Sequence, residues 1–163
     1  MQEMVQQKKG SRLGKGIKVL ACIAAVYGAF VAFARYMADK DKEMEKGNYG
    51  STEKKYLSFM NGKNIKISRE PVEDIQIRAV MGGVELNLTE AYITKDMDIT
   101  IKAVMSGVHI IVPPMVRVIL DGTNAMGGFA NMVPGYEDED LPTIFVTADS
   151  VMGGIAIEMK KED

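Results

Sequence analysis

The sequence predicts a small all-β domain, a β-solenoid of similar stacked units, preceded by one N-terminal transmembrane helix. Three observations predict this fold class: a short Met-containing phrase occurs four times, apolar and polar residues alternate around each copy, and one uncharged apolar run lies near the N-terminus. They divide the chain into four parts. These are a basic tail at 1–16, the helix at 17–37, a charged juxtamembrane linker at 38–63 and the β-solenoid at 64–163.

The repeated phrase consists of a small or aliphatic residue, then Met, then Gly-Gly or Ser-Gly. Its copies contain Met81, Met105, Met126 and Met152, and the spacings of 24, 21 and 26 residues are typical of solenoid coils. Glycine tolerates positive φ and close backbone approach, so each copy is expected to form a corner between strands. Because Met fills irregular gaps, we expect the four side chains to stack in successive core layers. Unrelated glycine turns in an ordinary sandwich are the alternative.

The segments around these corners alternate with a period of two, which is typical of half-buried strands. Val84, Leu86 and Leu88, for example, alternate with Glu85 and Asn87. The same alternation occurs in residues 75–79, 99–103, 108–112, 116–120, 144–148 and 155–159. Since no interval among them has a helical period, the chain from about residue 64 to about residue 160 is predicted to be all-β.

The string Val-Met-Gly-Gly-Val-Glu-Leu-Asn-Leu-Thr-Glu-Ala at 80–91 resembles the opening of the C-terminal domain of LiaF-type cell-wall-active antibiotics response proteins. Further matches follow in the family's order at 106–114, at 116–118 with Asp121-Gly122, and at 151–157. The resemblance extends over residues 75–160, and the ordered set of motifs is far more specific than a single Gly-Gly pair.

The resemblance implies a small single-stranded β-solenoid, toastrack-like, of the kind found beside transmembrane segments in bacterial membrane-stress proteins. In that family the domain modulates a sensor kinase or a related envelope-stress system, and it is not known as an enzyme. The implied function is therefore a membrane-anchored, non-catalytic regulator or scaffold in a cell-envelope (cell-wall antibiotic) stress response, acting by protein–protein interaction. Its implied partners are the lipid bilayer and a membrane sensor kinase or other envelope-stress protein. An extracytoplasmic adhesin-like or wall-binding module is the alternative.

The apolar run from Val19 to Ala34 is flanked by Lys18 and Arg35. If these two side chains snorkel, residues 17–37 provide the ~20 residues that cross a bilayer. An uncleaved anchor is the favoured interpretation. A cleaved signal peptide ending at the A-x-A pattern of residues 32–34 and a buried helix of a soluble protein remain the alternatives.

The same run contains Ala24, Gly28 and Ala32, a small-xxx-small ridge that suggests a homo-oligomer. The distribution of Lys and Arg says little about the orientation of the helix across the membrane. Five of these residues precede the apolar run and six follow it within a comparable distance. The family resemblance favours a cytoplasmic β domain on a single-pass protein of the cell membrane.

The sequence predicts neither a catalytic site nor a metal or cofactor site, so the protein is expected not to be an enzyme. His109 is the single histidine and is expected to point to solvent, while Cys22, the single cysteine, excludes an intramolecular disulfide. The four acids Glu137-Asp138-Glu139-Asp140, within an insertion at 135–141, lack the alternating geometry of a calcium loop and are expected to be solvated. A net charge of −2 without a basic stripe in the β half argues against nucleic-acid binding.

Overall fold

The structure is a computed structural model that describes residues 3–138 and 140–160, with side chains described from residue 18 onward, residue 139 again excepted. It forms two compact units, Met1–Asp39 and Lys40–Asp163. The single helix among the described residues, α1 (Glu3–Gly47), makes up the first unit and contributes its last turns to the second.

The first unit contains the apolar run, and the part of α1 from Lys18 onward is long and apolar enough to cross a membrane. Its apolar side chains, such as Val19, Leu20 and Val26, are exposed. A helix in the core of a soluble protein would bury such side chains, so the exposure disfavours that alternative. The helix agrees with the predicted span at 17–37.

The second unit contains ten described strands. They are β1 (Glu53–Phe59), β2 (Gly62–Pro71), β3 (Asp74–Val80), β4 (Gly83–Tyr92), β5 (Met97–Val104), β6 (Gly107–Val112), β7 (Arg117–Asn124), β8 (Gly127–Asn131), β9 (Thr143–Val151) and β10 (Gly153–Met159). The β structure begins at Glu53, so the expected linker at 38–63 is wrong from Glu53 onward. The strand β1 was missed because its buried positions include Lys54 and Ser58, which disguise the apolar period.

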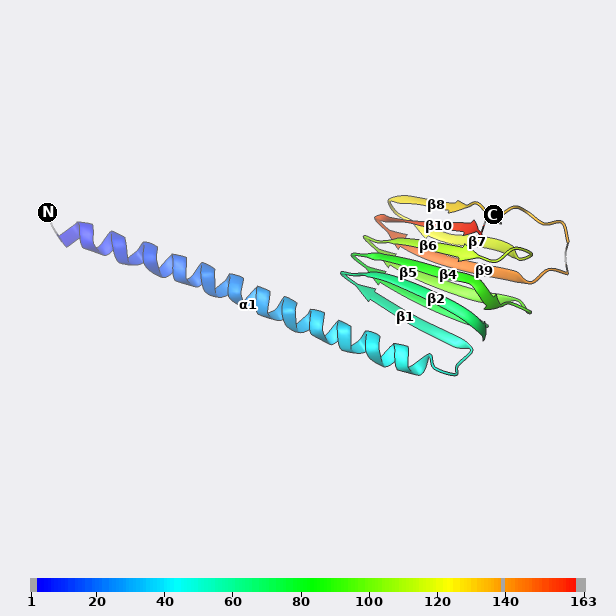
Figure 1. Cartoon of the computed structure of the whole chain (residues 1–163). Helices are drawn as coiled ribbons and strands as arrows, with labels where there is room; N and C mark the ends of the chain where they lie inside the picture. Colours follow the sequence, from blue (N-terminus) through cyan, green and yellow to red (C-terminus); the bar gives the residue numbers. More distant parts are fainter. Residues whose placement is uncertain (1–2, 139, 161–163) are drawn as a thin grey trace. The chain divides into compact units, whose positions relative to one another are not determined.

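The strands form two five-stranded sheets in which every neighbouring pair is parallel. One sheet has the order β1-β3-β5-β9-β7 and the other β2-β4-β6-β10-β8. Consecutive strands therefore alternate between the sheets, and each pair with the corner between its strands is called a coil below (Figure 1). These stacked parallel strands are consistent with the solenoid that we expected.

The coils do not follow one another in chain order. The last coil, β9–β10, lies between β5–β6 and β7–β8 in both sheets. The chain passes over one strand position after β6 and returns through residues 132–142, the connection that contains the expected acidic insertion at 135–141. A return path of this kind needs more residues than the two that join β2 to β3, which accounts for the length of the insertion.

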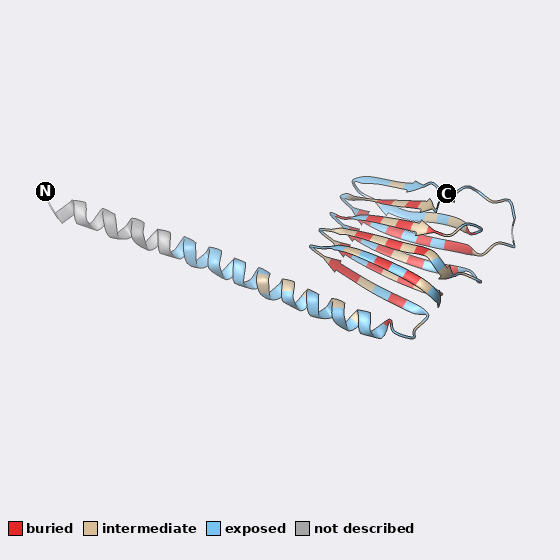
Figure 2. Ribbon diagram, in the orientation of Figure 1, coloured by how far each residue is buried: buried red, intermediate tan, exposed pale blue. Residues whose placement is uncertain are grey.

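The core lies between the two sheets, where alternate side chains of each strand meet (Figure 2). Ile99 and Ile101 on β5 face Ile110 on β6 and Ile157 on β10 across this core, and all four are fully buried. The residues between them, such as Thr100 and Lys102, are partly or fully exposed. The predicted period-two alternation is confirmed for the strands from β3 to β6 and for β9 and β10.

The last turns of α1 and the residue after them contact the first coil. Lys63 of β2 forms ion pairs with Asp41 and, at 3.0 Å, with Glu45. One turn later, the side chain of Asn48 donates to the carbonyl oxygen of Lys55 at 2.8 Å and accepts from its N–H at 2.7 Å. These contacts stabilise the end of the helix, where like charges such as Asp41 and Glu45 lie four residues apart.

We call the end of α1 from Asp41, together with Asn48, the cap of the first coil. The buried Lys54 joins this cap to the strands, because its ammonium donates to the carbonyl oxygen of Asn48 at 2.8 Å and to the Glu70 carboxylate at 2.6 Å.

We expect Lys54→Ala to lower the free energy of unfolding by about 1–3 kcal/mol, because the buried carbonyl oxygen of Asn48 loses its donor. The matched control Lys55→Ala removes an exposed ion pair and should change it by less than about 0.5 kcal/mol. Urea unfolding of the full chain in micelles, followed by circular dichroism, measures both. If both variants lowered the free energy of unfolding equally, the contacts of Lys54 with Asn48 and Glu70 would not stabilise the first coil.

Candidate functional site

The repeated phrases form one row at the corners between the two sheets. The register pairs Phe59 with Val80, Val80 with Val104, and Val104 with Val151. The residue that follows each of these is a methionine, so the methionines lie side by side on neighbouring coils. We call this set the methionine row; in spatial order it consists of Met60, Met81, Met105, Met152 and Met126.

The methionine row lies on the outside of the coils, so the expected stacking of Met81, Met105, Met126 and Met152 in the core is wrong. All four side chains are exposed. The inner positions before the corners hold the small buried residues Ala79, Ala103 and Ser150 instead of methionine.

Methionine, not glycine, takes the left-handed conformation at most of these corners. The φ angles are 51° at Met60, 54° at Met81, 50° at Met105 and 56° at Met152. A non-glycine residue rarely adopts such angles, and their recurrence at one structural position shows that the stacked coils impose the turn. The corners themselves were predicted, but their left-handed residue was assigned to the wrong amino acid.

Met60 belongs to the row but was missed in the sequence. Its phrase reads Phe59-Met60-Asn61-Gly62, with Asn in place of the first glycine. The available signal was the Met-x-Gly core at a spacing of 21 residues before Met81, the same spacing that separates Met105 from Met126.

The first glycine of the phrase allows neighbouring coils to come into contact. A Cβ atom on Gly82 would lie 2.1 Å from the carbonyl oxygen of Asn61, and one on Gly153 would lie 2.1 Å from that of Ser106. Distances this short exclude a side chain unless the backbone moves. Gly82 and Gly153 therefore allow the backbones of neighbouring coils to approach closely, as predicted.

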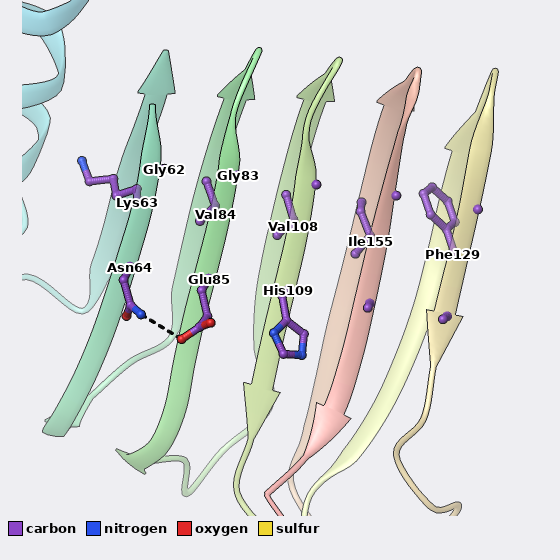
Figure 3. Close-up of a pocket in the computed structure, with 15 residues that line it drawn as sticks. Gly62, Lys63, Asn64, Gly83, Val84, Glu85, Val108, His109, Phe129 and Ile155 are labelled. Carbon is purple, nitrogen blue, oxygen red and sulfur yellow. Dashed lines mark hydrogen bonds between the residues drawn. The ribbon is translucent and has the colours of Figure 1, made fainter. Parts of the chain in front are cut away.

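The second glycine of each phrase faces outward on the sheet that contains β2 and β4. The register aligns Gly62, Gly83, Gly107, Gly154 and Gly128 across all five strands. Because these positions carry no side chains, they form a shallow apolar hollow, which we call the glycine floor (Figure 3). Asn64, Glu85 and His109 line the glycine floor on the side away from the corners. The amide of Asn64 donates to the Glu85 carboxylate at 2.8 Å.

His109 points outward from β6, as predicted. Its Nε2 atom lies 3.2 Å from a carboxylate oxygen of Glu158 on β10, and both side chains are substantially exposed. An exposed pair of this kind stabilises the protein little and provides no enclosed site for chemistry.

The acidic run is part of the connection between β8 and β9, where the described members Glu137, Asp138 and Asp140 are exposed. A carboxylate oxygen of Asp138 accepts the backbone N–H of Asp140 at 3.0 Å. Within residues 3–138 and 140–160, no group of three His, Cys, Asp or Glu side chains is placed to hold a metal ion.

The first coil contains the one strongly perturbed tyrosine of the described residues. Burial raises the pKa of Tyr56 to about 12, with smaller contributions from the negative charges of Glu70 and Glu45. The ammonium of Lys63 lies 6.0 Å from the centre of the same ring. Tyr56 therefore stays neutral at physiological pH.

These features define a class of protein. In this class, a domain of stacked parallel β coils follows one apolar helix in the sequence, and its main surface features are the methionine row and the glycine floor. Residues 59–140 match the family model described as cell wall-active antibiotics response LiaF, C-terminal. The chain belongs to this family. The match begins earlier and ends earlier than the predicted range of 75–160, and it confirms the resemblance.

Neither the curated proteins nor the solved structures contain a significant match to this chain. Its family membership assigns it to the cell-wall antibiotic stress response, and this family is not a known family of enzymes.

Proposed function

We propose that this protein is a membrane-anchored, non-catalytic regulator or scaffold of a cell-envelope stress response, acting through protein–protein contacts of its β domain. The observation that carries the proposal is the family match over residues 59–140, in a chain that also has a helix long and apolar enough to span a bilayer. The β domain is a toastrack-like solenoid that lies in the cytoplasm on a single-pass anchor. Its partner is a membrane sensor kinase or another envelope-stress protein.

Purification of the tagged full chain from bacterial membranes, before and after treatment with a cell-wall antibiotic, tests this function. The expected result is recovery of a membrane sensor kinase or other envelope-stress protein, in an amount that changes with the antibiotic. The variant Gly153→Ala keeps α1 but disturbs the coils, so it should lose the partner. The control Gly135→Ala lies outside the strands and the glycine floor, where an added Cβ atom has no neighbour within 4 Å, so it should keep the partner. Absence of such a partner, or equal recovery with Gly153→Ala, would refute the proposed role of the β domain.

The topology of the β domain distinguishes the proposal from the alternative of an extracytoplasmic wall-binding module. Protease added to intact cells should leave the β domain uncut, and permeabilised cells should show its cleavage. Cleavage in intact cells would place the domain outside and favour the alternative.

A further inference from the structure

The methionine row is an exposed apolar strip along the corner ends of the strands. Its five side chains are between 46% and 64% exposed, and the neighbouring Val104 and Val151 are exposed as well. Since adjacent strands lie about 4.8 Å apart, the row forms a strip roughly 19 Å long. Contiguous apolar surface of this kind marks an interaction site on most proteins.

The chain enters the β domain at the end that carries this strip. Lys63, just after the first corner, pairs with Asp41 and Glu45. Asn48, later in the same segment, bonds to Lys55 near the start of β1. The segment from Asp41 to Asn48 therefore runs antiparallel to β1, from the corner end toward the opposite end. The unit that contains the β domain begins at Lys40, so its first residues lie near the corner end of the first coil.

The length of the chain keeps the strip near the membrane. The predicted span ends at residue 37, four residues before Asp41. Four residues reach at most about 14 Å even when fully extended. If the helix spans the bilayer, as the proposed function requires, the corner end of the domain is held within reach of the lipid surface.

Basic side chains border the strip. Arg78 on β3 and Lys102 on β5 are exposed, face outward, and lie two residues before Val80 and Val104 at the corner end of each strand. The register partner of Lys102 on the next strand, β9, is Asp149, which accepts a hydrogen bond from the Thr123 hydroxyl at 2.7 Å. Two cations beside an apolar strip match the interface of a bilayer that contains anionic lipids.

We propose that the methionine row docks on the bilayer that holds α1, with its side chains at the boundary between headgroups and acyl chains and with Arg78 and Lys102 at anionic headgroups. The strands then stand upright on the membrane, and the glycine floor remains open sideways to a protein. A second copy in the same membrane presents its own row to the same bilayer, so two rows cannot meet face to face.

The absence of tryptophan from the sequence provides a clean test, because one introduced tryptophan is then the sole source of tryptophan emission. The full chain is reconstituted in vesicles of phosphatidylcholine and phosphatidylglycerol, with and without brominated acyl chains that quench tryptophan. Met105→Trp probes the row, and Asp98→Trp probes the opposite end of the same strand, β5. Tyr27→Trp probes the predicted span.

Bromolipid should quench Met105→Trp to an extent comparable with Tyr27→Trp, and it should leave Asp98→Trp unquenched. Adding Arg78→Glu and Lys102→Glu should weaken the quenching of Met105→Trp. Quenching of Tyr27→Trp without quenching of Met105→Trp overturns the docking but leaves the anchor intact, and blue-shifted, unquenched emission from Met105→Trp would show that protein covers the row instead. Loss of quenching at Tyr27→Trp refutes the anchor itself, and with it the proposed function.

Discussion

Gly153→Ala is expected to destabilise the β domain by about 3 kcal/mol or more. A Cβ atom at this position would lie 2.1 Å from the carbonyl oxygen of Ser106 and 3.1 Å from the Ser150 hydroxyl. The nearest atom belongs to the backbone of a neighbouring coil, so no side-chain rotation relieves the contact. The coils β5–β6 and β9–β10 must move apart, and this disturbs the parallel pairing on which both sheets depend.

Gly128→Ala is the matched control, because a Cβ atom there has no neighbour within 4 Å. Gly128 is the second glycine of another copy of the phrase, and its replacement by alanine should change the free energy of unfolding by less than about 1 kcal/mol. Thermal and urea unfolding of the full chain in micelles measures both variants. If the two alanines were equally harmful, the glycines would be needed for conformation rather than for close approach.

Strand alternation was the part of the fold that the sequence predicted best. The side chains of Ile75, Ile99 and Ile101 are fully buried, and alternation identifies them because a strand with one buried face must place apolar residues at every second position. The corners were found for a similar reason. Gly82 and Gly153 lie against a neighbouring backbone, where only glycine fits. The glycine therefore recurs in the sequence at these corners.

Other features depend on contacts between distant residues and leave little local signal. The insertion of β9–β10 between two earlier coils depends on which strands pair, and alternation within a strand carries no such information. The extension of α1 to Gly47 depends on Lys63, which pairs with Asp41 from 22 residues away. The strand β1 was hidden because Lys54 occupies an inward position and satisfies its charge with Asn48 and Glu70.

The candidate site was partly predictable. The four Met-containing phrases indicated the corners correctly, yet the side that the methionines face could not be derived from their spacing. A residue at positive φ breaks the alternation of the strand before it, so the period-two rule no longer indicates its direction. The exposure of the row, which carries the membrane-docking proposal, therefore became known only from the structure.

Ile99→Ala is expected to lower the free energy of unfolding by about 3–5 kcal/mol. Ile99 is fully buried on β5, the middle strand of its sheet, where its register partners are Ile75 and Val146. Removing three methylene-sized groups leaves a cavity, because neighbouring coils on both sides are held by backbone pairing and cannot collapse into it.

A graded series separates this cavity effect from a general disturbance of β5. Ile99→Val should cost about 0.5–1.5 kcal/mol, and Thr100→Ala, on the outer face of the same strand, less than about 1 kcal/mol. Urea titrations should show a lower midpoint for Ile99→Ala with an unchanged slope, because the same surface is exposed on unfolding. A loss confined to the Thr100 variant would contradict the assigned faces. A lower slope for Ile99→Ala would instead mean that the coils beside β5 unfold separately, because stacked units held by nearest-neighbour contacts lose cooperativity when a central one is weakened.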